Sequence, residues 1–356
     1  MSLDLTVDGD RWRDHLRSVA SGEPGLVPVV KGNGYGFTLG RLARKSQWLH
    51  DQGLGVDTLA VGTYEELPEV AQRYHGRLLV LTPWRPFGAA LELDPAYADR
   101  VIHTVSRAVD LPVLLARRPD ARFVLERSTS MLRHGMTTRE LWSTAEVVRG
   151  HPRARVEGVA LHLPLANGAN LSEVHRLLID VVATELPLDT VWVSHLSAAE
   201  LTALRTAYPD FTFHPRIGTD LWLGDRSALR VTATVLDVHE VERGDGFGYR
   251  HRTAPKAGHV LVVSGGTAHG IGLEAPLGDA SLRGRAATLA RGGMDAAGFV
   301  RSPFSIDGKQ RLFAEPPHMQ ASMLFLPHGA RVPAVGDVID VRVRYTATAF
   351  DRVVVS

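Results

Sequence analysis

Residues 27–218 alternate between short apolar runs of strand length and longer amphipathic stretches. In the amphipathic stretches apolar residues recur every three or four positions, which is typical of helices. We expect strands at Pro28–Lys31, Thr58–Gly62, Leu78–Thr82, Val101–Val105, Arg122–Glu126, Val156–His162, Val191–Ser194 and Phe213–Gly218. We expect helices at Leu39–Gln52, Tyr64–His75, Arg107–Arg117, Arg139–Val148, Leu171–Thr184 and Ser197–Ala207.

Eight repeats of this kind favour a (β/α)8 TIM barrel, an α/β fold whose parallel strands close into a ring. The alternative is a doubly wound open sheet. That fold is disfavoured because the count reaches eight and because no Gly-x-Gly-x-x-Gly fingerprint follows the first strand.

After about Leu223 the pattern changes to strands separated by Gly and Pro turns, with little helix. We expect strands at Leu229–Val241, Ala257–Val263, Met323–Leu326 and Val338–Tyr345. The chain therefore divides into a barrel domain over residues 8–224 and a C-terminal β-rich domain over residues 225–356.

Charge and cysteine content exclude several classes of function. The 40 basic and 39 acidic residues leave a net charge of +1 without a basic block, so neither nucleic acid nor a membrane is an expected partner. No apolar run approaches the roughly 18 residues of a membrane span, and no apolar signal core opens the chain. Cysteine is absent, which excludes disulfides and thiolate sites. We expect a cytoplasmic protein without a metal.

Lys31 ends the first predicted strand and is followed by a glycine-rich turn, Gly32-Asn33-Gly34-Tyr35-Gly36. A buried ammonium group must find partners or lose its proton, and the neutral amine can form a Schiff base with a carbonyl. The alternative is a lysine that simply reaches solvent. The glycines let backbone N–H groups approach a ligand, and Tyr35 adds a hydroxyl.

Further polar residues fall at the carboxyl ends of predicted strands, where barrels carry their chemistry. They are Arg133, His162, Ser194, His195, Ser197, Arg216, Gly218 and Thr219. Each has an ordinary structural alternative: a solvated arginine, a barrel histidine, or, for Ser197, a helix N-cap. Their convergence on one rim favours a functional site.

The segment around Lys31 resembles the Val-Val-Lys-Ala-Asn-Ala-Tyr-Gly motif of alanine racemases, with both alanines replaced by glycine. The motif's lysine binds pyridoxal 5'-phosphate (PLP). Further motifs follow in the family's order over nearly the whole chain. The resemblance implies a PLP-dependent amino-acid racemase with a barrel and a β-domain, and it implies that the β-domain takes its first strand from the N-terminus, about Leu3–Val7 within residues 1–7.

The resemblance also implies roles at the barrel rim. Arg133, in Met131-x-Arg133-x-Gly135, would bind the cofactor's phenolic oxygen and the substrate. His162 would lie against the pyridine ring, and Arg216 would face the pyridine nitrogen. The phosphate would be held by Ser197, Gly218, Thr219 and Tyr35.

In the second domain Gly244-Asp245-Gly246-Phe247-Gly248-Tyr249 resembles the family's Gly-Glu-Gly-Val-Ser-Tyr. Its tyrosine is the second catalytic base beside Lys31 and reaches across a dimer interface, so the resemblance implies a homodimer with shared sites. The alternative is a surface tyrosine on a hairpin. Met319, in a match to Cys-Met-Asp, would contact the amino-acid substrate.

Several residues depart from the family's pattern. Thr267 and His269 replace an aromatic and an acid, and Gln320 replaces the aspartate. Glu126 stands where a carboxylated lysine braces the phenolate-binding arginine, so we expect a bidentate contact between Glu126 and Arg133, or else a solvated glutamate. The departures leave open an amino-acid decarboxylase of the same fold, which Arg216 disfavours, or a degenerate PLP-binding protein without activity.

Overall fold

The computed structural model describes residues 2–165, 168, 170–186, 188–273 and 300–356. Two compact units divide the chain: Arg13–Gly224, and Met1–Trp12 together with Asp225–Ser356. Among the described residues, no helix is both long and apolar enough to cross a bilayer.

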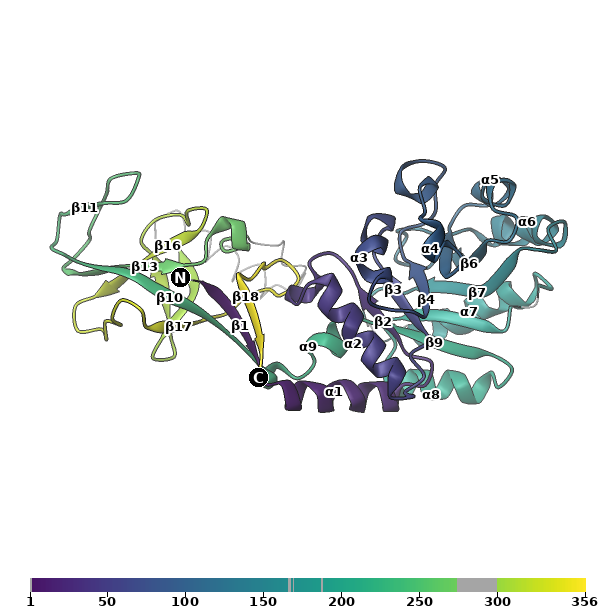
Figure 1. The fold of residues 1–356 in the computed structure, drawn as a ribbon, viewed down its shortest axis with the longest axis horizontal. Helices are drawn as coiled ribbons and strands as arrows, with labels where there is room; N and C mark the ends of the chain where they lie inside the picture. The colour runs from purple at the N-terminus through teal and green to yellow at the C-terminus, as the bar shows by residue number, and fades with distance from the viewer. Residues whose placement is uncertain (1, 166–167, 169, 187, 274–299) are drawn as a thin grey trace. The chain divides into compact units, whose positions relative to one another are not determined.

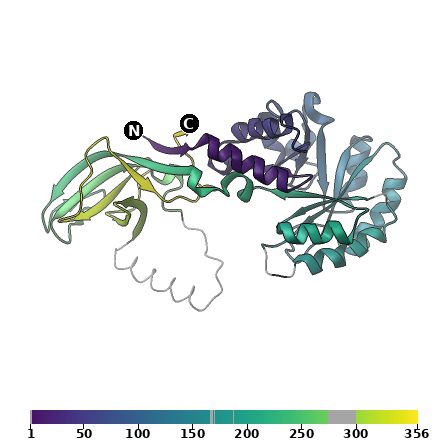
Figure 2. The same ribbon diagram turned by 90° about the horizontal axis from the view of Figure 1, so that it is seen from below.

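The first unit is a closed barrel of eight parallel strands with helices outside it (Figures 1 and 2). The strands are β2 (Val27–Val30), β3 (Thr58–Val61), β4 (Arg77–Val80), β5 (Val101–Val105), β6 (Arg122–Arg127), β7 (Arg155–His162), β8 (Thr190–Ser194) and β9 (Thr212–Ile217). All eight strands predicted from the sequence are confirmed to within two residues at each end. Lys31 lies just beyond β2 rather than within it.

The 14-residue helix α1 (Gly9–Gly22) was not predicted, but five of the six predicted helices are confirmed. They are α2 (Leu39–Asp51), α5 (Asp110–Arg117), α6 (Thr138–Arg149), α7 (Asn170–Val182) and α8 (Ala198–Ala207). The helix predicted over Tyr64–His75 is instead a 3-10 turn, η2 (Tyr64–Glu66), followed by the short α3 (Leu67–Ala71). Pro68 is tolerated only in the first turn of a helix, so α3 begins beside it.

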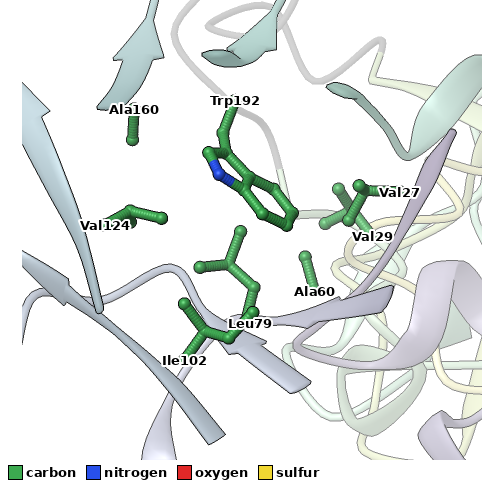
Figure 3. Close-up of a cluster of buried hydrophobic side chains, with 8 residues drawn as sticks. All are labelled: Val27, Val29, Ala60, Leu79, Ile102, Val124, Ala160 and Trp192. Carbon is green, nitrogen blue, oxygen red and sulfur yellow. The ribbon is translucent and has the colours of Figure 1, made fainter. Parts of the chain in front are cut away.

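A layer of apolar side chains fills the barrel (Figure 3). It consists of Val27, Val29, Ala60, Leu79, Ile102, Val124, Ala160 and Trp192. Alternate residues of a strand face the same side, so the residues two positions further along face the same interior. This second layer, at the carboxyl ends of the strands, includes Lys31, Glu126, His162 and Ser194. The core therefore positions the candidate site.

The second unit is an antiparallel sheet to which one parallel pair is added. Its strand order is β13-β16-β15-β14-β17-β10-β1-β18, and β10 also pairs with β13, so the strands from β13 to β10 form a ring. The strands are β1 (Leu3–Val7), β10 (Leu229–Val241), β13 (Gly258–Ser264), β14 (Arg301–Ile306), β15 (Lys309–Phe313), β16 (Ala321–Pro327), β17 (Val338–Val341) and β18 (Arg352–Val355).

The N-terminal strand belongs to this second sheet, as predicted. β1 pairs antiparallel with β10 and parallel with β18. The strand predicted over Val338–Tyr345 ends at Val341, and a turn follows in which the Ala347 N–H donates to the Arg344 carbonyl. A two-stranded hairpin, β11 (Gly246–Phe247) and β12 (Arg252–Thr253), flanks Tyr249.

Candidate functional site

Lys31 begins the turn that follows β2, and Glu66 organises the backbone beside it. The Glu66 carboxylate accepts hydrogen bonds from the Gly32 N–H and the Gly62 N–H, both at 2.7 Å. Burial of the amine lowers the pKa of Lys31, the nearby charges of Arg133 and Arg216 lower it further, and Glu66 opposes them. The Lys31 amine is therefore easier to deprotonate to its nucleophilic form than a lysine in water.

Tyr35 and Gly218 meet at the same rim. Tyr35 is buried and has a positive φ of 54°. A Cβ atom at Gly218 would lie 2.0 Å from the Tyr35 hydroxyl oxygen, so only glycine leaves room there. Burial raises the pKa of Tyr35 to about 12, with a contribution from Glu66, and the hydroxyl therefore keeps its proton as a donor. Thr219 follows as the first residue of the short α9 (Thr219–Leu223).

Arg216 projects into the barrel from β9 and is 8% exposed. Its Nη2 donates to the Leu161 carbonyl at 2.9 Å, but its buried Nε has no partner. Burial lowers the pKa of Arg216 to about 10, Glu126 opposes this shift and Arg133 adds to it. The guanidinium stays charged at neutral pH. An unsatisfied buried donor is costly, which suits a group that a ligand completes.

His162 is neutral at physiological pH. Its Nδ1 lies 2.7 Å from the Ser194 hydroxyl, and its ring centroid lies 5.2 Å from that of His195. Burial lowers the pKa of His162 to about 3, and the charges of Arg216 and Arg133 contribute. The ring is therefore a flat, uncharged surface among cations.

Glu126 is the acidic residue of this layer, and it is not a solvated rim glutamate. It is 3% exposed, and its Oε2 has no hydrogen-bond partner. The bidentate contact with Arg133 expected from the sequence is therefore wrong. Burial raises the pKa of Glu126, while Arg216, ahead of Arg133, acts to lower it. The electrostatic partner of Glu126 is thus chiefly the buried arginine, because both side chains point into the barrel.

Arg133 lies on the exposed loop after β6. The loop turns sharply, with Leu132 at a φ of 51° and Gly135 at 111°. A Cβ atom at Gly135 would lie 2.4 Å from the Ser128 nitrogen, so this turn requires glycine. Arg133 nevertheless acts electrostatically on Lys31, His162 and Arg216, which places it at the same rim.

Ser197 is the N-cap of α8. Its hydroxyl accepts from the Glu200 N–H at 3.3 Å and donates to the Glu200 carboxylate at 2.8 Å, which completes a capping box. The structural role of Ser197 is confirmed. A phosphate contact by the same hydroxyl stays a prediction.

Tyr249 lies in the second unit, where it is 87% exposed. Its N–H donates to Glu315 Oε1 at 3.3 Å, and His318 Nε2 lies 2.6 Å from the same oxygen. The Tyr249 and His318 rings are 4.6 Å apart. Gly248 has a φ of 72°, and a Cβ there would lie 2.3 Å from the Glu315 carboxyl carbon. Sequence analysis missed the buried Glu315, which no motif marks.

The diverged segment around Thr267 packs on the same region. The Thr267 N–H donates to the His318 carbonyl at 2.8 Å, and the Ala268 N–H donates to the Met319 carbonyl at 2.9 Å. The Met319 side chain is 72% exposed. His269 is buried, with Nε2 3.2 Å from Asp351 Oδ1. The second unit therefore brings together Tyr249 and Met319.

The predicted residues thus form two sets. The barrel rim carries Lys31, Tyr35, Arg133, His162, Arg216, Gly218 and Thr219, with Ser197 at the start of α8; the second unit carries Tyr249 and Met319. At the rim, Arg133 and Arg216 lie near the buried carboxylate Glu126, and Glu66 lies near Lys31. The excess of basic groups suits an anionic ligand. In the described part of the chain, no group of three or more His, Asp or Glu side chains is placed to hold a metal.

Comparison with known proteins agrees with this architecture. Residues 7–224 match the family described as alanine racemase, N-terminal domain. The chain belongs to this family. No curated protein matches its sequence. The resemblance inferred from the motifs is confirmed for the barrel.

Solved alanine racemases share the fold over the whole chain. Biosynthetic alanine racemase from Pseudomonas aeruginosa is 24% identical, with 97% of this chain and 91% of that chain covered and a TM-score of 0.65. Alanine racemase from Bartonella henselae, solved with covalently bound pyridoxal phosphate, is 15% identical, with both chains fully covered and a TM-score of 0.70. The enzyme from D-cycloserine-producing Streptomyces lavendulae is 20% identical, with 100% and 97% covered and a TM-score of 0.68. Barrel and β-domain are both confirmed.

Proposed function

We propose that this protein is a PLP-dependent amino-acid racemase, which interconverts L- and D-amino acids by proton transfer at Cα between two bases. The observation that carries the proposal is the pairing of Lys31, whose pKa is lowered, with the buried Arg216, whose Nε has no partner. Family membership and the covalent pyridoxal phosphate of the Bartonella henselae structure support it.

The rim fits the cofactor. PLP, when bound, supplies an electron sink for the pair left at Cα. Lys31 would hold its carbonyl carbon. The Arg216 Nε would donate to the pyridine nitrogen and keep that nitrogen unprotonated, because a guanidinium does not give up its proton. Neutral His162 would pack on the ring, and Arg133 would bind the phenolic oxygen.

The phosphate would lie where Tyr35 and Gly218 meet. The Tyr35 hydroxyl keeps its proton and can donate, and a glycine at 218 keeps the approach open. The N–H groups of Gly218 and Thr219 and the Ser197 hydroxyl would complete this part of the site. Together with Lys31, Arg133 and Arg216, these donors would neutralise an anionic cofactor.

Racemisation requires one acid–base group on each face of Cα. Lys31 would serve one face. Tyr249, exposed in the second unit, would serve the other in the site of a partner copy, so the proposed enzyme is a homodimer with shared sites. Arg133 and Met319 would contact the amino-acid substrate.

The test is a Lys31→Ala variant measured beside Lys309→Ala, which removes an exposed lysine of β15. We expect Lys31→Ala to lose the visible absorbance of bound cofactor and nearly all turnover, since Lys45, the other lysine of the barrel unit, lies over the Trp48 ring on α2. Lys309→Ala should retain both. Borohydride reduction and peptide mapping identify the attached lysine. Chiral chromatography over a panel of L-amino acids identifies the substrate.

Other outcomes would overturn the proposal. Cofactor attached to another lysine contradicts the assignment of Lys31. Release of CO2 without racemisation indicates a decarboxylase. Bound cofactor without any turnover indicates a degenerate member, the result in which the departures at Thr267, His269 and Gln320 have removed activity.

A further inference from the structure

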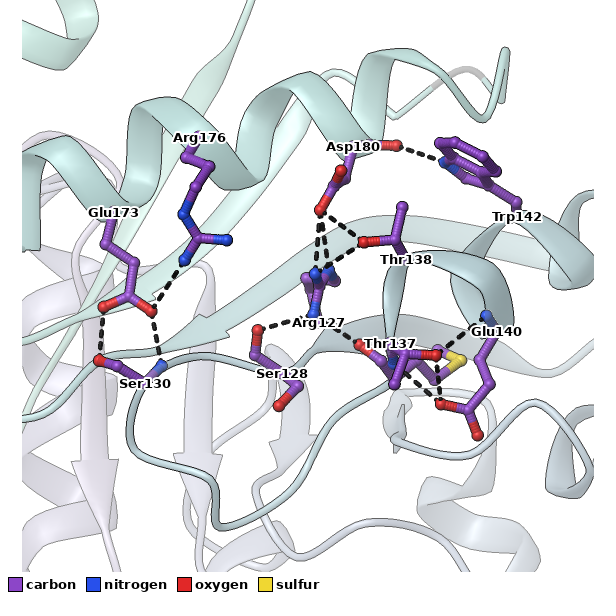
Figure 4. A network of polar contacts seen from close by, with 11 residues as sticks. Arg127, Ser128, Ser130, Thr137, Thr138, Glu140, Trp142, Glu173, Arg176 and Asp180 are labelled. Atoms are coloured by element: carbon purple, nitrogen blue, oxygen red, sulfur yellow. Dashed lines mark hydrogen bonds and ion pairs between the residues drawn. The ribbon is translucent and has the colours of Figure 1, made fainter.

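The loop that carries Arg133, residues 128–136, is fastened to helix α7 by one carboxylate (Figure 4). The Ser130 N–H donates to Glu173 Oε1 and the Ser130 hydroxyl donates to Glu173 Oε2, both at 2.6 Å. Both oxygens of one side chain therefore hold one residue. The Glu173 side chain is only 10% exposed although Ser130 itself is exposed, and bonds of this kind to a carboxylate are charge-assisted.

The base of the loop is fixed separately by Arg127. Its Nη1 donates to the carbonyls of Ser128 and Met136, both at 2.9 Å, and its Nη2 donates to Asp180 Oδ2 at 3.0 Å (Figure 4). The Ser128 N–H also donates to the Met136 carbonyl at 2.9 Å. Arg127 therefore holds the two ends of the loop together but does not reach its tip.

The tip depends on two successive residues. The Thr129 hydroxyl donates to the His162 carbonyl at 2.6 Å, and Ser130 binds Glu173 as described. Arg133 follows within three residues, and its guanidinium forms no hydrogen bond with any residue that the structure describes. Thr129 and Ser130 thus fix the loop backbone from which the exposed Arg133 side chain extends.

The first turn of α7 holds the neighbouring strand ends as well. The Asn170 Nδ2 donates to the Pro164 carbonyl at 3.1 Å and to the His195 carbonyl at 2.9 Å. Asn170 and Glu173 together contact the segments that follow β6, β7 and β8. One helical turn therefore sets the relative position of the strand-end segments that carry Arg133, His162 and Ser197.

We propose that Glu173 is a positioning residue for Arg133, acting through Ser130. The proposal rests on the function proposed above, in which Arg133 binds cofactor and substrate. In the family motif that this segment resembles, glycine stands in place of Ser130, so the hydroxyl half of the contact is a feature of this chain. Glu173→Ala removes both bonds to the loop, whereas Ser130→Ala removes only the bond from the hydroxyl.

The experiment compares Glu173→Ala, Glu173→Gln and Ser130→Ala, with Arg176→Ala as the matched control. Arg176 lies on the same helix and approaches the same carboxylate at 3.7 Å, but it is largely exposed and does not touch the loop. The first readout is amide hydrogen exchange of peptides that cover residues 128–136 in the cofactor-free protein. The second is the Michaelis constant and kcat of the loaded enzyme with the amino acid that it racemises.

We expect faster exchange over residues 128–136 in Glu173→Ala, a smaller effect in Ser130→Ala and none in Arg176→Ala. The loss of kcat/KM for Glu173→Ala should be about ten- to a hundred-fold, mostly through the Michaelis constant, because a displaced guanidinium weakens binding before it alters the proton transfer. Glu173→Gln should recover part of this loss, because its amide oxygen still accepts one bond.

Unchanged exchange over residues 128–136 in Glu173→Ala overturns the proposal, as does a loss of kcat with an unchanged Michaelis constant. If Glu173→Ala does not fold, the hydrogen exchange and kinetic constants of Glu173→Gln and Ser130→Ala test the proposal instead. Failure of the proposed function has a different signature: the wild-type protein then shows no turnover, and the cofactor's dissociation constant replaces the kinetic readout. Equal cofactor affinity in wild type and Glu173→Ala then counts against the positioning role.

Discussion

The barrel rim and the Tyr249 cluster are held in different ways. At the rim, Glu126 and Arg216 are buried side chains that extend one step beyond a closed apolar layer. In the second unit, Tyr249 is held by its backbone N–H and by ring contact with His318, and it leaves most of its side chain exposed. Buried side chains at the rim of one barrel can hold charges in fixed positions. An exposed tyrosine is instead free to contact a site on another subunit.

Departures from the family's pattern occur in both regions, at Glu126 and Ser130 in the barrel and at Thr267, His269 and Gln320 in the second unit. In the second unit, the turn at Thr267 is fixed by backbone bonds to the carbonyls of His318 and Met319. The turn can therefore keep its geometry while its side chains change. At the rim the side chains themselves would form the proposed site, so the change to Glu126 there alters its charge balance directly.

The largest expected effect is the recovery of activity when subunits with a defective barrel rim are mixed with subunits that lack the Tyr249 hydroxyl. Lys31→Ala and Tyr249→Phe subunits should each be inactive alone. When they are mixed and exchanged, activity should return to about a quarter of wild type, because half of the dimers are mixed and each mixed dimer has one intact site. The measurement is racemase turnover after subunit exchange has been verified with two different tags.

A mixture of Lys31→Ala with Arg216→Ala is the control. Both residues belong to the same barrel, so no mixed dimer contains an intact site, and we expect no recovery. Recovery in this control, or none in the first mixture after verified exchange, would contradict sites shared between copies.

The second effect concerns the charge balance of the rim. Glu126→Gln should retain the cofactor but lower turnover about ten- to a hundred-fold, because Arg216 loses its buried counter-charge. Burial raises the pKa of Glu126, so the carboxylate forms only above that raised value and wild-type activity falls as the pH falls through it. The variant should lack this acidic limb, as pH–rate profiles will show.

Added CO2 should change neither the turnover of the wild type nor that of Glu126→Gln, since no lysine has to be carboxylated for Glu126 to act. Glu65→Gln, at an exposed glutamate near the end of β3, is the control and should behave as wild type. A Glu126→Gln enzyme with wild-type rates and the wild-type pH profile would show that the buried carboxylate has no part in turnover.

Sequence pattern was most informative where burial is uniform. The barrel strands are buried on both faces, so they read as continuous apolar runs, and all eight were located. β14 and β15 were missed because polar residues interrupt them, and because Pro303 within β14 argues against a strand. Helix α1 (Gly9–Gly22) was also missed.

Site residues followed the same rule. The placement of Lys31, His162 and Arg216 at the barrel rim was predicted because strand ends are predictable positions, while their roles stay predictions. Glu66, Glu173 and Glu315 were not found, since each acts on backbone groups more than 30 residues away in sequence or on a turn that no motif marks. The Glu126 contact was mistaken because sequence order does not reveal which arginine shares the barrel interior.

The smallest expected effect is on the pH dependence of folding stability, and it distinguishes His162 at the rim from His103 in the barrel wall, the part formed by the strands themselves. His103 on β5 is 1% exposed and its Nδ1 lies 2.8 Å from the Tyr64 hydroxyl, and burial lowers its pKa to about 3. The unfolded chain binds a proton there near pH 6.5 but the folded chain does not, so stability falls as the pH drops from about 6.5 toward 3. Between pH 6.5 and 5 this group should cost about 1.5 kcal/mol.

Urea unfolding of the cofactor-free protein at pH 6.5 and 5 measures this loss. His162 should add its own share, since its pKa is also lowered to about 3, but its share depends partly on the cations Arg216 and Arg133. His103→Gln should therefore reduce the pH dependence by nearly the same amount at low and high salt, because burial is the main cause of its shift and Arg118 makes a smaller contribution. His162→Gln should reduce it more at low salt, where the exposed Arg133 is less screened. Equal salt dependence in both variants would mean that the rim and the wall do not differ electrostatically.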